Sequence, residues 1–115
     1  MSYDITKTNH ETEKQDANTR PILKAKRTVI TSAAMHALDP DDVNTALRRH
    51  AACDWGRCGF EAWQRNDDAV QRELRVAAVY KDRRGTSFWI ITAANRSVTT
   101  ILLNGEQFRR EAHGE

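Results

Sequence analysis

The longest apolar stretch of the chain covers residues 86–103, where β-branched and aromatic side chains dominate. Residues 93–96 interrupt this stretch once, with the length and the asparagine (Asn95) of a hairpin turn. A second apolar run at residues 75–80 precedes it, and the connection at residues 82–85 contains Gly85, as a tight turn would. The pattern therefore predicts three antiparallel strands in sequence order.

The two turns also predict a register, with Lys81 opposite Thr86 and Thr92 opposite Ser97. Because side chains alternate along a strand, this register divides them between two faces, and a shift of one residue would exchange the sets. The face expected to pack against helices consists of Val76, Ala78, Tyr80, Trp89, Ile91, Val98, Thr100 and Leu102. The more exposed face carries Val79, Phe88 and Ile101 at one end and Arg75, Ala77, Ile90, Thr92, Ser97 and Thr99 at the other.

Helical signals lie before the strands. Asp39 suits an N-cap and Pro40 the first helical position, so a helix is predicted from there to about Ala51. A short helix through Leu38 is predicted to begin at Thr31 or Ser32, and a further helix covers about residues 60–73. Residues 28–31 have the β-branched composition of an additional strand.

These elements predict an α+β domain, with two or three N-terminal helices packed on a three- to four-stranded antiparallel β-meander. We expect residues 1–26 to form a disordered, basic N-terminal tail, residues 27–110 the single domain, and residues 111–115 a frayed end. Residues 20–27 hold four bases and no acid. They are interpreted either as an arm that contacts phosphates or as a linker that packs Ile22 and Leu23 on the domain.

Composition limits the class of protein. The chain has 115 residues, of which 39% are hydrophobic and 30% charged, which is enough for one small core. A net charge of only +2 excludes a histone-like binder and a strongly acidic mimic of DNA. The sequence has neither an apolar run of membrane-spanning length nor the layout of a signal peptide, so we expect a cytoplasmic protein.

His50, Cys53 and Cys58 have a spacing that invites a metal hypothesis, but zinc would need a fourth ligand. A disulfide between the two cysteines would need an oxidising compartment. We therefore expect reduced thiols, no metal and no cofactor.

Two groups of residues could carry chemistry. His50 is interpreted either as a core residue or as a general acid and base that Asp54 orients. The guanidinium groups of Arg75 and Arg96 could hold a phosphate, supported by the hydroxyl groups of Thr92, Ser97 and Thr99. The alternative for this second group is an exposed strand with a solvated turn arginine.

The chain also resembles a family of small proteins encoded on plasmids, phages and bacterial chromosomes, to which no activity is assigned. The resemblance covers about residues 28–103 and includes the motifs Arg49-His50, Asp54-Trp55-Gly56, Asn66-Asp67, Tyr80, Trp89-Ile90-Ile91-Thr92, Arg96-Ser97-Val98-Thr99-Thr100 and Leu102-Leu103. The chain departs from the family at Asn95, where the family usually has an acid, and at Cys53 and Cys58. More loosely, the order of helices and meander is similar to the barnase/RelE-like group of small ribonucleases and toxins.

This second likeness implies an RNA-directed ribonuclease or toxin of mobile elements, independent of metal. In that hypothesis His50, Arg75 and Arg96 are catalytic, and Thr92, Ser97, Thr99 and Asp54 contact the substrate. The alternative is a non-enzymatic protein-interaction module, such as an inhibitor of a host defence complex. Its partner would bind through Val79, Phe88 and Ile101.

Overall fold

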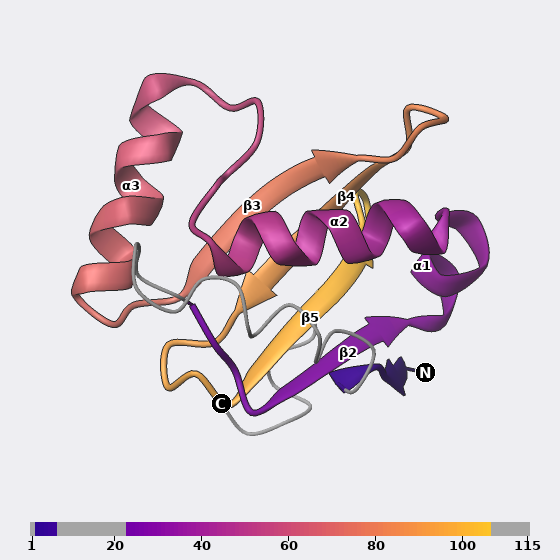
Figure 1. The fold of residues 1–115 in the computed structure, drawn as a ribbon, viewed down its shortest axis with the longest axis horizontal. Coiled ribbons are helices and arrows are strands. Elements are labelled where there is room, and N and C mark those ends of the chain that lie inside the picture. Colours follow the sequence, from indigo (N-terminus) through magenta and orange to yellow (C-terminus); the bar gives the residue numbers. More distant parts are fainter. Residues whose placement is uncertain (1, 7–22, 107–115) are drawn as a thin grey trace.

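The computed structural model describes residues 2–6 and 23–106, and Figure 1 shows their arrangement. Five strands and three helices follow one another along these residues. They are β1 (Ser2–Asp4), β2 (Arg27–Thr31), α1 (Ser32–Ala37), α2 (Pro40–Ala51), α3 (Phe60–Gln71), β3 (Val76–Lys81), β4 (Ser87–Thr92) and β5 (Val98–Leu103). The predicted α+β class is confirmed.

The strands form one sheet in the order β1-β2-β5-β4-β3. Strands β3, β4 and β5 are the antiparallel meander that the sequence predicted, but β2 pairs with β5 in parallel, so the sheet is mixed. The prediction of a wholly antiparallel sheet of three or four strands is therefore corrected. Strand β1 pairs with β2 through Tyr3 and Ile30 and lies where no element was predicted. The rest of the predicted tail up to residue 22, and the predicted frayed end, lie outside the described residues.

The β4–β5 register differs by two residues from the prediction, because Thr92 pairs with Thr99 rather than Ser97, and this shift leaves the faces of the two strands unchanged relative to each other. The β3–β4 register differs by one residue from the prediction, because Lys81 pairs with Ser87. The turn between these strands is one residue longer than predicted. The side chain of Asp82 organises it by accepting hydrogen bonds from the backbone N–H groups of Arg84 (2.9 Å) and Thr86 (3.0 Å). Burial works against the charge of Asp82, but these backbone donors keep the pKa of its carboxyl below the usual value.

This shift exchanges the faces of β4 and β5 relative to β3. Phe88 and Ile101 were expected on an exposed face, but both are fully buried in the core. Trp89 was expected in the core, but it is only partly buried and lies on the opposite face. A partner surface formed by Val79, Phe88 and Ile101 is therefore excluded, since two of the three side chains cannot be reached.

The predicted helix starts are confirmed. The hydroxyl of Thr31 accepts a hydrogen bond from the N–H of Ala34 and caps α1. The carboxylate of Asp39 accepts from two N–H groups of the first turn of α2, and Pro40 occupies the first helical position. Both caps satisfy donors that the helix itself leaves without partners.

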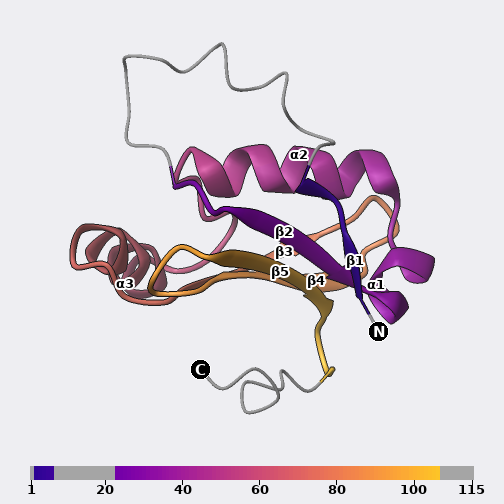
Figure 2. The ribbon, with the colours of Figure 1, turned by 90° about the horizontal axis from the view of Figure 1, so that it is seen from below.

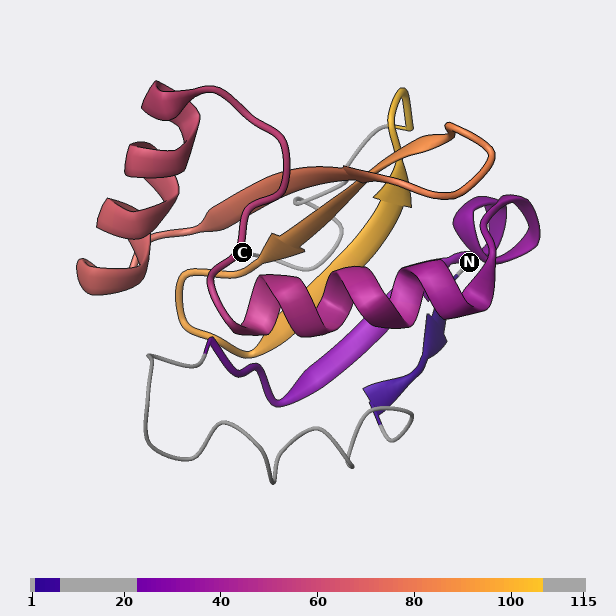
Figure 3. The ribbon, with the colours of Figure 1, turned by 45° about the horizontal axis from the view of Figure 1, so that its top comes forward.

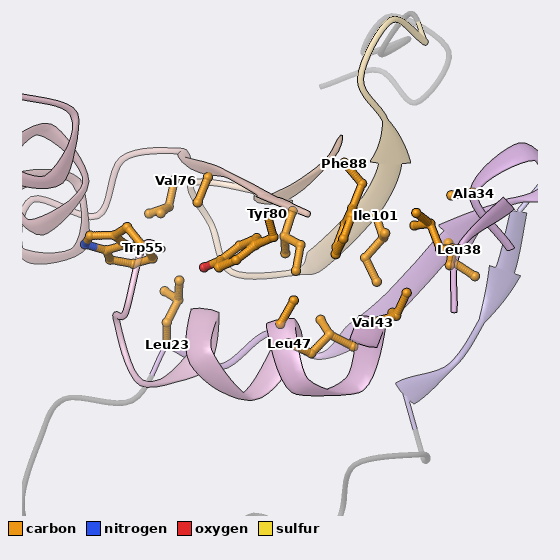
Figure 4. Packing of buried hydrophobic residues seen from close by; sticks show 14 of the residues in the cluster. Leu23, Ala34, Leu38, Val43, Leu47, Trp55, Val76, Tyr80, Phe88 and Ile101 are labelled. Atoms are coloured by element: carbon orange, nitrogen blue, oxygen red, sulfur yellow. The ribbon is translucent and has the colours of Figure 1, made fainter. Parts of the chain in front are cut away.

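The core lies between α2 and one face of the sheet (Figures 2 and 4). From α2 it receives Val43, Ala46 and Leu47, and from the sheet it receives Val76, Ala78, Tyr80, Phe88, Ile90 and Ile101. Leu23 also packs there, and its N–H donates to the carbonyl of Ala51. Leu23 therefore packs on the domain, as one interpretation of residues 20–27 expected, whereas Ile22 lies outside the described residues.

Helix α3 lies beside strand β3, at the edge of the sheet (Figure 3). The side-chain amide of Asn66 donates to the carbonyl of Ala77 at 3.0 Å, so the helix satisfies part of this edge. Gly56, at φ +79°, brings the preceding loop against the ring of Tyr80, where a Cβ atom would lie 3.3 Å from the ring. Among the described residues, no helix is long and apolar enough to cross a membrane.

Candidate functional site

The imidazole of His50 lies between α2 and the core face of the sheet. Val43, Ala46 and Leu47 share its side of the helix, so the apolar stripe that buries α2 also buries the ring, which is 2% exposed. Its Nε2 atom is 3.0 Å from the hydroxyl oxygen of Thr92. Its Nδ1 atom lies 3.4 Å from the hydroxyl oxygen of Tyr80. Both ring nitrogens therefore face hydroxyl groups of the fold.

The hydrogen bonds continue beyond the ring on both sides. The hydroxyl groups of Thr92 and Thr99 are 2.7 Å apart and both residues are buried. The hydroxyl of Tyr80 donates to the backbone carbonyl of Asp54 at 2.8 Å. Within residues 2–6 and 23–106, no buried side-chain nitrogen or oxygen lacks a partner. The network links α2, the loop after it and three strands.

Electrostatics keeps this network neutral. Burial lowers the pKa of His50 from 6.5 to about 3, and the positive charge of Arg96 acts in the same direction. Burial also raises the pKa of Tyr80 well above its usual value, and the negative charge of Asp54 adds to that effect. At neutral pH neither group exchanges a proton readily, and neither side chain reaches the surface.

Arg96 is held by backbone carbonyl groups. One terminal nitrogen of its guanidinium donates to Leu74 at 2.9 Å and to Ala93 at 3.2 Å. The other lies 3.3 Å from the carbonyl of Ala69 and 3.4 Å from that of Val70. These two carbonyls belong to the last turn of α3, where a cation also complements the helix dipole. Arg96 thus ties the β4–β5 turn to the end of α3.

The structure brings together only part of the predicted site. His50, Thr92 and Thr99 are in contact, but on the buried face of the sheet rather than on the exposed one. Arg96 is close enough for its charge to act on His50. Arg75 is exposed and precedes β3 on the other face by the alternation of side chains. The backbone N–H of Ser97 donates to the side chain of Asn95 in the turn.

Asp54 does not orient the imidazole through its side chain. Its carboxylate accepts hydrogen bonds from Arg49 at 3.1 Å and from the N–H of Gly56 at 3.1 Å. The guanidinium of Arg49 in turn lies over the ring of Tyr80, 5.7 Å from its centre. Asp54 therefore shapes the loop that covers Tyr80.

Cys53 and Cys58 are not joined in a disulfide. In the part of the chain that is described, no group of three or more histidine, cysteine or acidic side chains is placed to hold a metal ion. Trp55 between them is buried and donates its indole N–H to Asp67 at 2.9 Å.

The opposite face of the sheet has a different character, and Figure 2 shows that no described helix or strand covers it. We call it the open face and define its apolar part by the side chains that alternate with the core positions. On β3, β4 and β5 these are Ala77, Val79, Trp89, Ile91, Val98 and Leu102. Ile91 and Leu102 at its centre are 6% and 3% exposed, whereas the other four are partly exposed.

Four of these six side chains were expected in the core, because the predicted register was shifted between β3 and β4. The signal that would have found this face is the length of the β3–β4 turn. Asp82 precedes Gly85 by three residues, and a five-residue turn capped by that carboxylate gives the observed pairing.

No family profile, curated protein or solved structure matches this chain.

Proposed function

We propose that this protein is a non-enzymatic protein-interaction module rather than a ribonuclease. One observation carries the proposal. The imidazole of His50 is 2% exposed and is engaged through both ring nitrogens with Thr92 and Tyr80. It is the residue on which the ribonuclease hypothesis depends for proton transfer.

Metal-free cleavage of RNA requires a group that gives or takes a proton at the scissile bond, within hydrogen-bond reach of the substrate. An imidazole that RNA cannot reach, with a pKa of about 3, does not meet this requirement. The ribonuclease hypothesis also needs the guanidinium of Arg96 to hold a phosphate, but that group already donates to the end of α3 and to its own turn.

The fold supports a binding role instead. The buried polar network and the Arg96 contacts join the helices to the meander, so they stiffen the sheet without leaving reactive groups at the surface. A stiff sheet with one face free of described helices offers a preorganised surface, which lowers the cost of binding. An inhibitor of a multisubunit complex is one protein of this class.

The test is an RNA-cleavage assay with the full-length protein on structured RNA. Wild type and His50→Gln are compared at equal concentration, together with Thr45→Gln as a control on the exposed side of α2. We expect all three to leave the RNA intact. Cleavage by wild type and by the Thr45 variant that His50→Gln abolishes would overturn the proposal.

A further inference from the structure

Helix α3 lies at the outer edge of the sheet, and its outer side faces away from the other described elements (Figures 1 and 3). Its two buried residues, Asn66 and Ala69, lie on the opposite side of the helix. Large apolar side chains stay exposed at both ends of α3. Phe60 in the first turn is 74% exposed, and Leu74, just beyond the last turn, is 46% exposed. These are the two most exposed large apolar side chains of the described residues.

A row of charged side chains with alternating sign runs along the exposed side of α3. Its members follow one another at spacings of four, three and four residues, which places them on one side of a helix, and all of them are exposed. They are Glu61, Arg65, Asp68 and Arg72. Reading the row backwards exchanges every sign. The row therefore complements a second copy of itself that runs in the opposite direction, whereas a parallel copy would place like charges together.

Contacts within the helix do not use up this row. Glu61 and Arg65 have the spacing of an intrahelical pair, but neither takes part in an ion pair among the described residues. Asp68 and Arg72 do form one, with a nitrogen of the guanidinium 3.1 Å from Oδ2 of the carboxylate. More than half of each of these two side chains is exposed. Each can therefore take a second partner without giving up the first.

We propose that two copies of the chain associate through α3, with the two helices antiparallel and a two-fold axis at the middle of the helix. In this alignment Arg65 of each copy reaches Asp68 of the other, and Glu61 reaches Arg72. The existing pair between Asp68 and Arg72 is kept and becomes the centre of a network of four side chains. The symmetry produces this network twice.

The neighbouring residues of α3 support the same alignment. Phe60 and Leu74 lie almost equally far from the axis on either side of it, so Phe60 of each copy packs against Leu74 of the other. This contact removes from water the apolar groups that the isolated chain leaves exposed. Between these ends, Gln64 faces Gln71 of the second copy, and their side-chain amides can donate to and accept from each other.

One contact opposes association. Asp67 lies next to the axis, where it approaches the same residue of the second copy. Its carboxylate accepts the indole N–H of Trp55 at 2.9 Å, so it is held in place and stays near the axis. Replacing this carboxylate by an amide would keep an acceptor for the indole and remove the repulsion. Asp67→Asn should therefore tighten the dimer, an effect that no role within a single chain would produce.

The association is expected to be weak and reversible. A helix of 12 residues is about 18 Å long, so the contact is smaller than a standard permanent interface. We expect a dissociation constant on the order of 10–100 µM, and an increase in that constant at high salt because the ion pairs are close to water. This inference does not depend on the proposed function, and either can fail without the other.

The experiment is sedimentation velocity of the full-length protein at concentrations from about 5 µM to about 500 µM, which bracket the expected constant. The sedimentation coefficient of the wild type should rise from that of a monomer to that of a dimer. Phe60→Ser should raise the dissociation constant at least tenfold, and Asp67→Asn should lower it. Arg48→Glu, a charge reversal on the exposed side of α2, is the matched control and should leave it unchanged.

Two charge reversals test the antiparallel alignment. Arg65→Glu and Asp68→Arg each place like charges opposite one another in a homodimer, so each variant alone should dissociate at least tenfold more readily than the wild type. In an equal mixture of the two variants, the acid introduced at position 65 meets the base introduced at position 68. The mixture should therefore associate within about fivefold of the wild type.

Three results would overturn the inference. The wild type could remain a monomer over the whole concentration range. A dimer that Phe60→Ser and Arg65→Glu leave intact would place the contact on another surface. A mixture of the two charge variants that associates no better than either alone would show that positions 65 and 68 do not meet across the axis.

Discussion

Replacing Arg96 should destabilise the fold, although sequence reasoning placed this residue in a substrate site. The guanidinium makes its two shorter contacts with the carbonyl groups of Leu74 and Ala93, at 2.9 and 3.2 Å, and longer ones with the last turn of α3. A hydrogen bond from a charged donor contributes about 1.5–3 kcal/mol when well formed. Because the side chain is only partly buried, we expect Arg96→Ala to lower the free energy of unfolding by about 2–3 kcal/mol.

The backbone conformation of Arg96 allows the effect of lost side-chain contacts to be separated from that of backbone strain. Its φ is +63°, in the left-handed region, which costs an ordinary residue about 1–2 kcal/mol relative to glycine. Arg96→Gly removes the same side-chain contacts but relieves that strain, so it should be about 1 kcal/mol more stable than Arg96→Ala. Arg96→Lys keeps the charge near the helix end, so its free energy of unfolding should lie between those of wild type and Arg96→Ala.

Urea unfolding followed by tryptophan fluorescence measures all three variants, and Arg72→Ala, at the exposed C-cap of α3, is a matched control. The control removes one exposed ion pair and should cost less than about 0.5 kcal/mol. If Arg96→Ala costs no more than the control, or if Arg96→Gly is more stable than wild type, the guanidinium does not hold the turn to α3.

Three further outcomes are expected. Phe88→Ala should lower the free energy of unfolding by about 3–5 kcal/mol, because the ring is fully buried. Trp89→Ala should lower it by only about 1–2 kcal/mol. Equal losses in urea titrations would contradict the observed β3–β4 register. Thr92→Val leaves Nε2 of His50 without its partner and should cost about 1–3 kcal/mol by the same assay, while a neutral effect would mean that the contact is not required. The pKa of His50 is near 3 in the folded protein and near 6.5 when unfolded, so stability is full above about pH 6.5 and declines as pH falls towards 3. The loss between pH 7 and pH 5 should be about 2 kcal/mol, and His50→Gln should flatten that slope; an unchanged slope in the variant would rule out His50 as its source.

The elements that sequence reasoning located correctly are those with local causes. Asp39 and Pro40 mark the start of α2 because the cap and the fixed φ of proline act within one turn. Thr31 marks α1 for the same reason. The strands β3, β4 and β5 were found from their own composition.

The β3–β4 register and the parallel strand β2 could not be predicted from local sequence in the same way. Asp82 accepts hydrogen bonds from Arg84 and Thr86, and this contact adds a residue to the turn that spacing alone does not reveal. One added residue was enough to exchange the faces of β4 and β5. The parallel pairing of β2 with β5 joins residues about 70 positions apart in the chain, which no local pattern reports.

The predicted placement of the site residues differs from the structure for a related reason. Thr92 and Thr99 carry hydroxyl groups and were assigned to an exposed face, but inside the core these hydroxyls bond to each other, and that of Thr92 also bonds to His50. Arg96 was interpreted as a free cation because its acceptors, the carbonyls of Ala69 and Leu74, are over twenty residues away. Buried polar residues look like surface residues until their partners are known.

Accessibility of the open face can be measured directly by thiol labelling of Ala77→Cys and Ala78→Cys, each in a chain with Cys53→Ser and Cys58→Ser. The two positions are adjacent on β3, with Ala77 on the open face and partly exposed and Ala78 in the core at 4%. We expect the thiol at position 77 to react without unfolding and that at position 78 only through unfolding, which slows it by about a thousandfold or more. Equal protection of the two thiols would mean that the face is already covered and is not available to a partner.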